Sequence, residues 1–378
     1  MTSAPQPSPE PLVRARRDGS VFAITLDRPR AINALTSEMF ALLDAALRAA
    51  HGGLVAAAAP SGGGFRLAPP RAILLDGAGE RGFCGGGDIK EISTGDTTAI
   101  LAAEYRVDHA IATSRIPVVA VMDGVTMGGG IGLGGHAALR IVTERSRLAM
   151  PEVRIGIVPD VGGHLLLARA PGRLGELLAL TAREMGPGDA IALGFADRFL
   201  PAERLGELRR ALVAGDDPER TAAELAEPAP EAPILAAAAW WAPIAEAALG
   251  GPRPVTEDPR GAALRLLAAL EASPEPAARA ASDAIRGMCP MSVVVTLAQI
   301  DRTRREGLAL PEVLADDLRV LGRLGARADF REGVRAQVID KDRSPRWIPD
   351  RIEELDPAEV ARILDPAPLP GEAALRFG

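Results

Sequence analysis

The residues best suited to chemistry lie in one stretch, residues 116–163, where two acidic side chains follow a run of three glycines. The glycines are Gly128–Gly130, and the acids are Glu152 and Asp160. Glycine leaves the backbone N–H uncovered, and the first N–H groups of a helix have no intrahelical partner. Such donors stabilise an oxygen that becomes negatively charged in a reaction, and carboxylates can move protons. The stretch therefore predicts an oxyanion site beside acid–base groups.

Short apolar runs alternate with helical patterns through the first 200 residues, which predicts an α/β domain. The predicted strands are 20–27, 71–76, 118–122, 139–143 and a short one at Phe199-Leu200. The first predicted helix covers 37–50, with Thr36 as its cap and with Met39, Leu43 and Leu47 on one apolar face. A second glycine-rich loop follows the strand at 71–76 and ends at Gly87.

From residue 202 onward the pattern is helical, so we divide the chain into a core at 12–201 and a mostly helical region at 202–378. Helices are predicted near 258–272, 275–287, 292–305, 311–324 and 329–339. The proline-rich stretch at about 222–258 is expected to form loops or a linker. Residues 51–70 are expected to be a surface loop, and residues 1–11 a disordered tail.

Composition limits the possible partners. The net charge of −7 argues against nucleic acid, and the longest apolar runs are too short to span a membrane. Two cysteines argue against a disulfide framework and favour a reducing compartment, so we expect a cytoplasmic protein. The start of the chain has no apolar segment typical of a secretory signal. No cysteine and histidine spacing is typical of a metal site.

Five motifs in order resemble the enoyl-CoA hydratase/isomerase (crotonase) superfamily. They are ITLDRPRAINAL at 24–35, GFCGGGDIKEI at 82–92, TMGGGIGLGGHAALRIVTE at 126–144, MPEVRIGIVPDVGG at 150–163 and DFREGVRAQVIDKDRSPRW at 329–347. The last three are most similar to the 3-hydroxyisobutyryl-CoA hydrolase branch. The resemblance covers residues 12–350 with gaps. It implies a spiral of ββα turns whose helical C-terminal region covers an acyl-CoA pocket.

The resemblance also implies roles for individual residues. Backbone N–H groups of Gly85 and Gly129 would form the oxyanion hole, Glu152 and Asp160 would be catalytic, and Glu104 would contact the substrate. The remaining expected substrate-binding residues are Gly86, Gly87 and Asp88. Coenzyme A would arrive as part of the substrate, so no separate cofactor is expected. Family members commonly associate, so a homo-oligomer is possible.

One position separates the activities of this superfamily. Its hydratases use two glutamates, and the first of these would stand at residue 132, where this chain has glycine. Gly132 has no side chain to carry a proton, whereas Asp160 follows the pattern of the hydroxyacyl-CoA hydrolases. The implied reaction is hydrolysis of 3-hydroxyisobutyryl-CoA, or a close 3-hydroxyacyl-CoA, in valine breakdown. Glu152 would act as general base or would form an anhydride.

Other interpretations of the same residues remain open. The chain could be an enoyl-CoA isomerase or hydratase of the same fold, or a non-catalytic acyl-CoA-binding protein. Glu104 could be an ordinary solvated helix residue, and Asp160 or Asp88 could only cap a helix. Structural roles are expected for the histidines and for Cys84, because no histidine and acid pair is spaced to activate the thiol.

Overall fold

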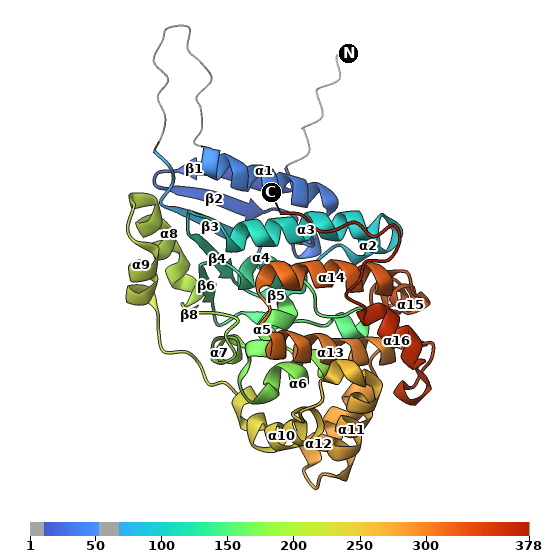
Figure 1. Ribbon diagram of the computed structural model, residues 1–378. Coiled ribbons are helices and arrows are strands. Elements are labelled where there is room, and N and C mark those ends of the chain that lie inside the picture. Colours follow the sequence, from blue (N-terminus) through green and yellow to red (C-terminus); the bar gives the residue numbers. More distant parts are fainter. Residues whose placement is uncertain (1–10, 53–67, 378) are drawn as a thin grey trace.

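The computed structural model describes residues 11–52 and 68–377 (Figure 1). The predicted disordered tail, apart from residue 11, and most of the predicted loop at 51–70 lie outside the described residues.

A six-stranded sheet forms the centre of the N-terminal part, with the order β1-β2-β3-β4-β6-β8. Its strands are β1 (Val13–Asp18), β2 (Val21–Leu26), β3 (Ala72–Gly77), β4 (Val118–Met122), β6 (Leu139–Val142) and β8 (Arg198–Phe199). Strand β1 pairs antiparallel with β2, and the other pairs are parallel. The five predicted strands are present. Strand β1 was not predicted, because its sequence VRARRD is that of a charged edge strand.

A second, two-stranded sheet pairs β5 (Val125–Met127) with β7 (Arg147–Ala149) in parallel. Strand β5 directly precedes the glycine run, and β7 precedes the segment that carries Glu152. They bring the Gly128 loop beside the segment that carries Glu152, and Gly128 N–H donates to the Ala149 carbonyl at 3.1 Å.

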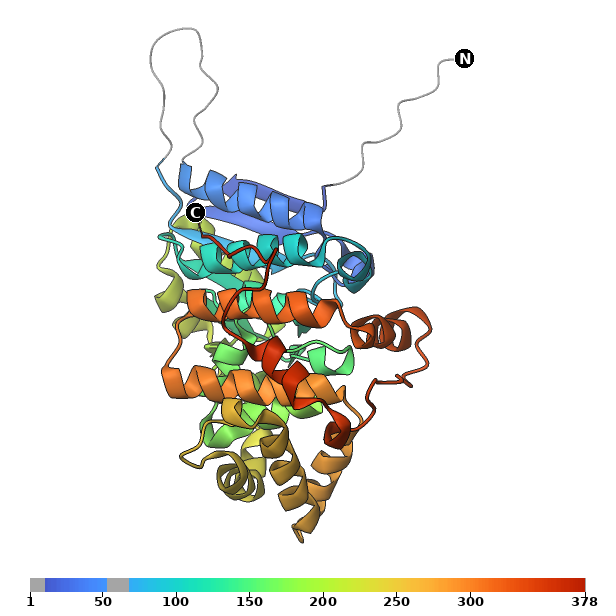
Figure 2. The same ribbon diagram turned by 45° about the vertical axis from the view of Figure 1, so that its right-hand side comes forward.

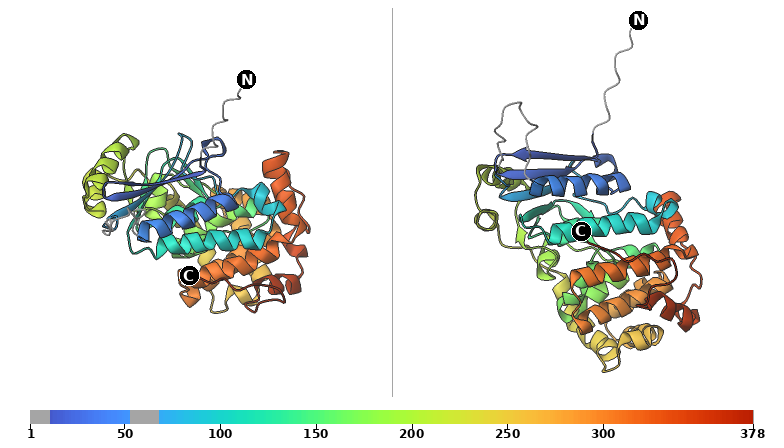
Figure 3. Two further views of the ribbon diagram at one scale, coloured as in Figure 1. Left: turned by 90° about the horizontal axis from the view of Figure 1, so that it is seen from above. Right: turned by 45° about the horizontal axis from the view of Figure 1, so that its top comes forward.

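Both faces of the large sheet are covered, as is usual when strands run parallel. Along β2, Phe22, Ile24 and Leu26 belong to the main core, while Val21 and Ala23 belong to a second cluster on the opposite face. The main face is covered by α1 (Ser37–Gly52) and α3 (Thr97–Ala112), and the opposite face by α8 (Leu205–Ala214) and α9 (Pro218–Leu225). In the left panel of Figure 3, α1 (blue) and α3 (teal) lie side by side along one face of the sheet.

Helix α1 forms where the apolar spacing predicted it. The hydroxyl of Thr36 accepts a hydrogen bond from the Met39 N–H at 3.3 Å, which satisfies one of the free donors at the helix start. Met39, Leu43 and Leu47 are buried. Each such side chain contributes about 1.5–3 kcal/mol on leaving water, so this stripe fixes the helix on the sheet.

The chain from residue 202 onward is mostly helical and stacks on the core. Its main helices, besides α8 and α9, are α10 (Ile234–Leu249), α11 (Pro259–Ala272), α12 (Pro276–Arg286), α13 (Pro290–Glu306), α14 (Leu310–Gly325), α15 (Ala328–Val334) and α16 (Pro357–Leu364). In Figure 2, α13 and α14 run alongside each other with α16 between their ends. Helix α14 packs on α3 and α13 packs on α5, so this region covers the core.

The proline-rich stretch at 222–258 is a correction to the sequence analysis. It contains α10, a helix of 16 residues with Pro243 in its interior. Proline removes one helical hydrogen bond and usually breaks a helix. Here Trp241 and Ala245 are completely buried. Packing of this apolar face therefore outweighs the local penalty of the proline. Helix α16 lies beyond 329–339, the last helix that the sequence analysis predicted.

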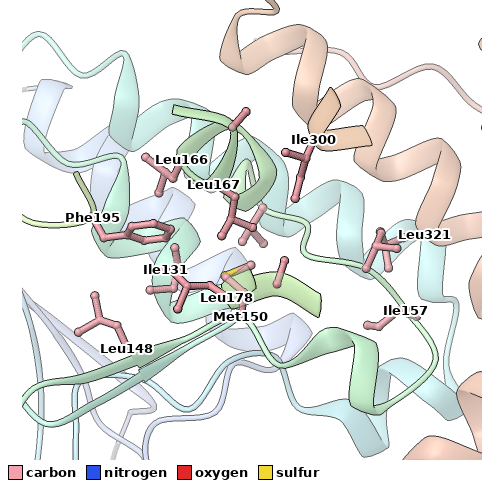
Figure 4. Packing of buried hydrophobic residues seen from close by; sticks show 14 of the residues in the cluster. Ile131, Leu148, Met150, Ile157, Leu166, Leu167, Leu178, Phe195, Ile300 and Leu321 are labelled. Atoms are coloured by element: carbon pink, nitrogen blue, oxygen red, sulfur yellow. The ribbon is translucent and has the colours of Figure 1, made fainter. Parts of the chain in front are cut away.

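The shorter helices of the core follow the two glycine loops and the segment with Glu152 and Asp160. They are α2 (Ile89–Thr94), α4 (Gly129–Gly135), α5 (Gly163–Arg169), α6 (Leu174–Thr181) and α7 (Pro187–Ala192). Figure 4 shows buried apolar side chains of the core and of the C-terminal helices in one cluster, including Ile131, Met150, Ile300 and Leu321. Among the described residues, no helix is both long enough and apolar enough to cross a bilayer.

Candidate active site

A pocket with about 680 Å³ of empty space lies where the two glycine loops meet the C-terminal helices. Its walls come from the first glycine loop, α2, α3, the start of α4, the segment after β7, and α14 and α15. The lining residues are Gly85, Gly86, Gly87, Ile89, Ile92, Thr97, Leu101, Glu104, Met127, Gly128, Gly129, Pro151, Glu152, Ile155, Ile157, Asp160, Leu321, Gly325 and Phe330. The pocket is therefore an apolar chamber with three carboxyl groups and a run of bare backbone.

The glycine triplet turns sharply into α4. Gly128 has φ +48° and ψ −116°, a conformation that only glycine adopts readily, and Gly129 is the first residue of the helix. The N–H of Gly129 donates to no acceptor in the described chain, as expected for a first-turn amide. A methyl group at 128 would lie 2.9 Å from Glu152 Oε1. The bare turn and the Glu152 carboxyl are thus in direct contact.

In the other loop the structure corrects the predicted donor. The N–H of Gly85 donates to the Ile32 carbonyl at 2.7 Å and is not available to a ligand. Gly87 and Leu35 form an isolated parallel β-bridge. The Leu35 N–H donates to the Gly86 carbonyl, and the Asp88 N–H donates to the Leu35 carbonyl. The Gly87 N–H donates to no acceptor within residues 11–52 and 68–377. A methyl group on Gly129 would lie 3.3 Å from this nitrogen.

The two free amides that face one pocket therefore belong to Gly87 and Gly129. Motif position alone could not show which amide of this loop stays free, because that depends on how residues 32–35 pair with residues 85–88. Gly86 lines the pocket as expected, and its N–H lies 3.4 Å from the Cys84 sulfur.

Glu152 stands on a short 3₁₀ turn that follows β7. Its side chain is buried and lines the pocket, and Oε2 has no hydrogen-bond partner among the described residues. Burial, followed by the negative charge of Asp160, holds the pKa of Glu152 well above its ordinary value. A carboxylate in this setting accepts a proton far more readily than one in water.

Asp160 is buried at the edge of the same pocket. Tyr105 on α3 donates its hydroxyl hydrogen to Asp160 Oδ2 at 2.6 Å. Burial and the charge of Asp317 raise the pKa of Asp160 to about 7, although the bond from Tyr105 opposes the shift. Asp160 does not cap α5 with its side chain, since the cap of that helix is Gly162 without a side-chain bond. The capping alternative for Asp160 is wrong.

Glu104 lies inside the protein, so the interpretation as a solvated helix residue is also wrong. It is buried on α3 with 2% of its surface exposed and it lines the pocket. A methyl group on Gly129 would collide with its Oε1 atom, which has no hydrogen-bond partner in the described chain. Burial, then the charge of Asp160, holds the pKa of Glu104 well above its ordinary value.

Asp88 has a structural role, which corrects the prediction that it contacts substrate. Its side chain caps α2 by accepting from the Glu91 N–H at 3.4 Å, and it pairs with Arg28 at 2.7 Å. Asp88 does not line the pocket. The alternative interpretation as a helix cap is the one that the structure confirms.

Several buried polar residues around the pocket were missed by the sequence analysis. Tyr105 and Asp108 lie on α3 next to Glu104, and Asp108 shares its face four residues on. Both Asp108 oxygens are buried without a partner in the described chain, and a methyl group at Gly132 would lie 2.8 Å from each. The spacing of Glu104 and Asp108 was visible in the sequence, but their burial depends on α14.

The thiol of Cys84 is buried, and burial raises its pKa to about 12, which rules it out as a nucleophile at neutral pH. No three histidine, cysteine, aspartate or glutamate side chains within the described ranges are arranged to hold a metal ion.

The chain is similar to known proteins over most of its length. The model of the enoyl-CoA hydratase/isomerase family matches residues 21–364. The 3-hydroxyisobutyryl-CoA hydrolase, mitochondrial, of Gallus gallus is 33% identical over 374 residues, which cover 94% of this chain and 89% of the relative. The protein of the same name from Homo sapiens is 32% identical and covers 91% of this chain and 86% of its own length.

Two solved structures are similar over nearly the whole chain. A carnitinyl-CoA dehydratase from Mycobacterium thermoresistibile has a TM-score of 0.83 at 34% identity and covers 97% of this chain and 99% of its own. An enoyl-CoA hydratase from Rhodobacter sphaeroides has a TM-score of 0.78 at 39% identity, with 94% and 97% covered. The C-terminal helical region is therefore shared with both.

Proposed function

The chain belongs to the enoyl-CoA hydratase/isomerase family, and from that premise we propose that it hydrolyses the thioester of 3-hydroxyisobutyryl-CoA or a close 3-hydroxyacyl-CoA. The expected fold, a crotonase-like core under a helical C-terminal region, is that of its solved relatives. One observation carries the proposal: the buried carboxyl of Glu152 opens into the same pocket as the free amides of Gly87 and Gly129.

The two amides provide the electrostatic part of the reaction. The thioester carbonyl oxygen sits between the Gly87 and Gly129 N–H groups and becomes negatively charged when the carbon is attacked. Donors that are already in place need no reorganisation, and removing one typically lowers the rate by about 10²–10³. The start of α4 adds the positive end of a helix at the same point.

Glu152 provides the proton transfer. As a general base it takes a proton from water while the water oxygen bonds to the carbonyl carbon. The carbon–sulfur bond then breaks, and the sulfur leaves with its electron pair as the coenzyme A thiolate. A direct attack by Glu152 would form an anhydride that water cleaves in a second step. Both routes consume one water and release the hydroxy acid and coenzyme A.

Asp160 and Glu104 supply the specificity in this proposal. Both are buried and line the pocket, and in this proposal the Asp160 oxygen that does not bond to Tyr105 accepts the 3-hydroxyl group. A site built to bond a hydroxyl group discriminates strongly against substrates that lack it, because its polar groups are then left unpaired. The curated relatives carry this 3-hydroxyacyl substrate in their names, and a role in valine breakdown agrees with it.

The experiment is thiol release from 3-hydroxyisobutyryl-CoA by the purified protein and by Glu152→Gln. We expect the wild type to release coenzyme A and Glu152→Gln to lose at least about 10²–10⁴ in kcat, the usual contribution of a general base, with an unchanged melting temperature. Glu203→Gln is the matched control, because Glu203 is exposed on the surface. Near-normal turnover by Glu152→Gln would refute the mechanism.

A second function within the family needs the same test, because both solved relatives have hydratase or dehydratase names. Loss of the conjugated double bond of crotonyl-CoA would indicate hydration, and movement of a double bond would indicate isomerisation. Tight binding of either substrate without reaction would indicate a non-catalytic protein. The glycine at 132, with Asp108 filling the space beside it, favours hydrolysis over two-carboxylate hydration.

In this proposal coenzyme A arrives with the substrate, and the groups of the chain provide the proton transfers without a resident cofactor. A cytoplasmic location agrees with two unpaired, buried cysteines, although the relatives named above are mitochondrial. Association into a homo-oligomer remains a proposal that sedimentation measurements can test.

A further inference from the structure

A buried histidine and aspartate pair lies behind Asp160 and outside the pocket lining. His164 on α5 and Asp317 on α14 are 1% and 0% exposed at their side chains, and His164 Nε2 lies 2.9 Å from Asp317 Oδ1. The other ring nitrogen of His164, Nδ1, lies 2.9 Å from the hydroxyl oxygen of Thr303. Both ring nitrogens therefore have a polar neighbour, and the ring orientation is fixed.

The pair is attached directly to the loop that carries Asp160. The N–H of Gly162, two residues after Asp160, donates to Asp317 Oδ2 at 3.0 Å. Gly162 has φ +73°, so the loop turns at the residue that Asp317 holds. Tyr105 holds the Asp160 carboxyl from α3 at the same time. Asp160 is thus fixed by α3 through its side chain and by α14 through its backbone.

Stability alone is a poor explanation for such a pair. Burying two ionisable groups removes their hydration, and well-packed apolar residues of similar size are often equally stable or more stable. A single backbone bond could also be accepted by a neutral side chain. What only charged groups provide is an electric field at a neighbouring carboxyl, and Asp160 is that neighbour.

We propose that His164 and Asp317 form a positioning pair, which holds the Asp160 loop and, through the opposite charges of its two members, sets the proton occupancy of Asp160. The inference rests on the proposed function, in which the ionised Asp160 accepts the hydrogen of the substrate's 3-hydroxyl group. The bond that Tyr105 donates to Asp160 favours that ionised form.

The two members act on Asp160 in opposite directions. The charge of Asp317 raises the pKa of Asp160, and the charge of His164 lowers it by a smaller effect. Burial favours the neutral form of His164, while Asp317 favours the charged form, and on balance the pKa of His164 is raised. The other groups that face the pair and Asp160 are Glu104, Tyr105 and Asp108 on α3, Glu152 after β7, Arg302 and Thr303 on α13, and Asp316 on α14.

The experiment compares the pH dependence of kcat/KM for wild type, Asp317→Asn and His164→Gln with 3-hydroxyisobutyryl-CoA. Asparagine keeps an oxygen that can accept from Gly162 but removes the charge. We expect its acid limb to move to lower pH and that of His164→Gln to move to higher pH, each by about 0.5–1 unit, the usual effect of one nearby charge. The double variant should move in the direction of Asp317→Asn but by less, because the two effects oppose each other and that of Asp317 is larger.

A purely structural role would produce a different result. It would lower kcat/KM and the melting temperature in both variants without moving the limbs, or would move both limbs in the same direction. Either outcome overturns the proposal. The shifts should be smaller with isobutyryl-CoA, which has no hydroxyl group for Asp160 to bind.

Two further variants protect the comparison from general damage. Glu176→Gln removes another buried carboxylate, which lies on α6 and pairs with Arg173 just before that helix and with Arg304 on α13. It should lower the melting temperature and leave the acid limb in place. Thr303→Val removes only the hydroxyl contact of His164, and it should move the limb in the same direction as His164→Gln by a smaller amount.

Failure of the proposed function can be separated from failure of the pair. If the wild type releases no thiol, hydrolysis is wrong, but a thioether analogue of 3-hydroxyisobutyryl-CoA still reports on Asp160 through its binding. The pH midpoint of its Kd should then move in opposite directions in Asp317→Asn and His164→Gln. Midpoints that stay fixed or move together would overturn the pair in either case.

Discussion

Gly128 shows how closely single residues define this site. Its backbone lies at φ +48° and ψ −116°, and a β-carbon there would lie 2.9 Å from Glu152 Oε1. Gly128→Ala therefore strains the turn and pushes the carboxyl away from the free amides. We expect kcat/KM for thioester hydrolysis to fall by about 10²–10³, comparable to the loss of an oxyanion donor. The strain should destabilise the fold by about 1–3 kcal/mol.

Gly186→Ala is the matched control for this variant. Gly186 has an ordinary extended backbone at φ −75°, and a β-carbon there meets no atom within 4 Å. Its activity and melting temperature should remain those of the wild type. If Gly128→Ala kept full activity, the close contact between the glycine turn and Glu152 would have no catalytic meaning.

At this scale the sequence predicted residue identity better than residue environment. Glu152, Asp160 and Gly129 were selected from their motifs, and the structure brings them into one pocket. The wrong donor, Gly85, and the wrong exposure of Glu104 have one cause. Both depend on segments far away in the chain, the bridge at Leu35 and the cover by the C-terminal helices, which no local pattern encodes.

Among the elements, α14 connects most parts of the site. It packs on α3, lines the pocket through Leu321, and carries Asp317. Near its end, the guanidinium of Arg323 is 6% exposed and pairs with Glu372 at 2.8 Å. It also donates to four carbonyl oxygens, those of Arg362 and Ile363 in the last turn of α16 and those of Asp365 and Ala367 just after it.

This arrangement predicts that one arginine fastens the C-terminal segment. Arg323→Gln removes the charge and most of the donors, so the last residues should detach, including Phe377, whose ring stacks on His109 of α3 at 4.0 Å. We expect faster amide exchange and faster carboxypeptidase cleavage beyond residue 365. The loss of stability should be about 1.5–3 kcal/mol, the usual contribution of a hydrogen bond to a charged group, because the Glu372 side chain is 26% exposed and keeps part of its hydration.

Arg362→Gln tests the same segment without breaking the anchor. The Arg362 side chain is exposed, and its one ion pair within the described part of the chain is with Glu359, at 3.7 Å. Its exchange pattern should match that of the wild type. Equal exchange of the C-terminal segment in Arg323→Gln and wild type would show that apolar packing, and not the arginine, holds the segment.

Secondary-structure prediction from the sequence succeeded where apolar residues recur at helical spacing. It failed where many prolines suggested loops. Helix α1 matched its apolar stripe and its cap at Thr36. Helix α10 was read as loops because of its prolines, yet its apolar face finds a partner that only the folded molecule provides. Strand β1 was missed for a different reason. It is a mostly exposed edge strand, so its sequence has no alternating apolar pattern.

For the whole molecule, the main consequence is a layer of buried acids around the pocket. Glu104, Asp108 and Glu152 have pKa values well above their ordinary ones because of burial, and the pKa of Asp160 is raised to about 7. A group whose pKa is higher in the folded than in the unfolded state stabilises the fold fully below its unfolded pKa. That contribution is lost as pH rises through the folded pKa.

Two other sets of groups act in the opposite direction. Burial lowers the pKa of His136 to about 4, so its contribution is present above its unfolded pKa and is lost as pH falls below about 6.5. Surface carboxyls such as Glu271, beside Arg286, have lowered pKa values and lose their pairing only at lower pH. They are largely exposed and contribute little each. Burial also raises the pKa of Asp317, so five buried carboxyls outweigh one buried histidine between pH 8 and 5.

The melting temperature should accordingly rise as pH falls from 8 and reach its maximum near about pH 5–6, on the acid side of the usual range.

Asp108→Asn identifies the cause, because Asp108 has no partner for either oxygen in the described chain and does not line the pocket. Removing its ionisable group should stabilise the protein at pH 8, because burial raises the pKa of Asp108 and the unfolded wild type gains free energy by ionising it. The stabilisation should shrink as pH falls from 8 to 5 and disappear only below about pH 4, the ordinary pKa of an unfolded aspartate. Calorimetry at several pH values tests both, and a wild-type melting temperature that falls steadily from pH 8 to 5 would show that these acids do not govern the stability of the fold.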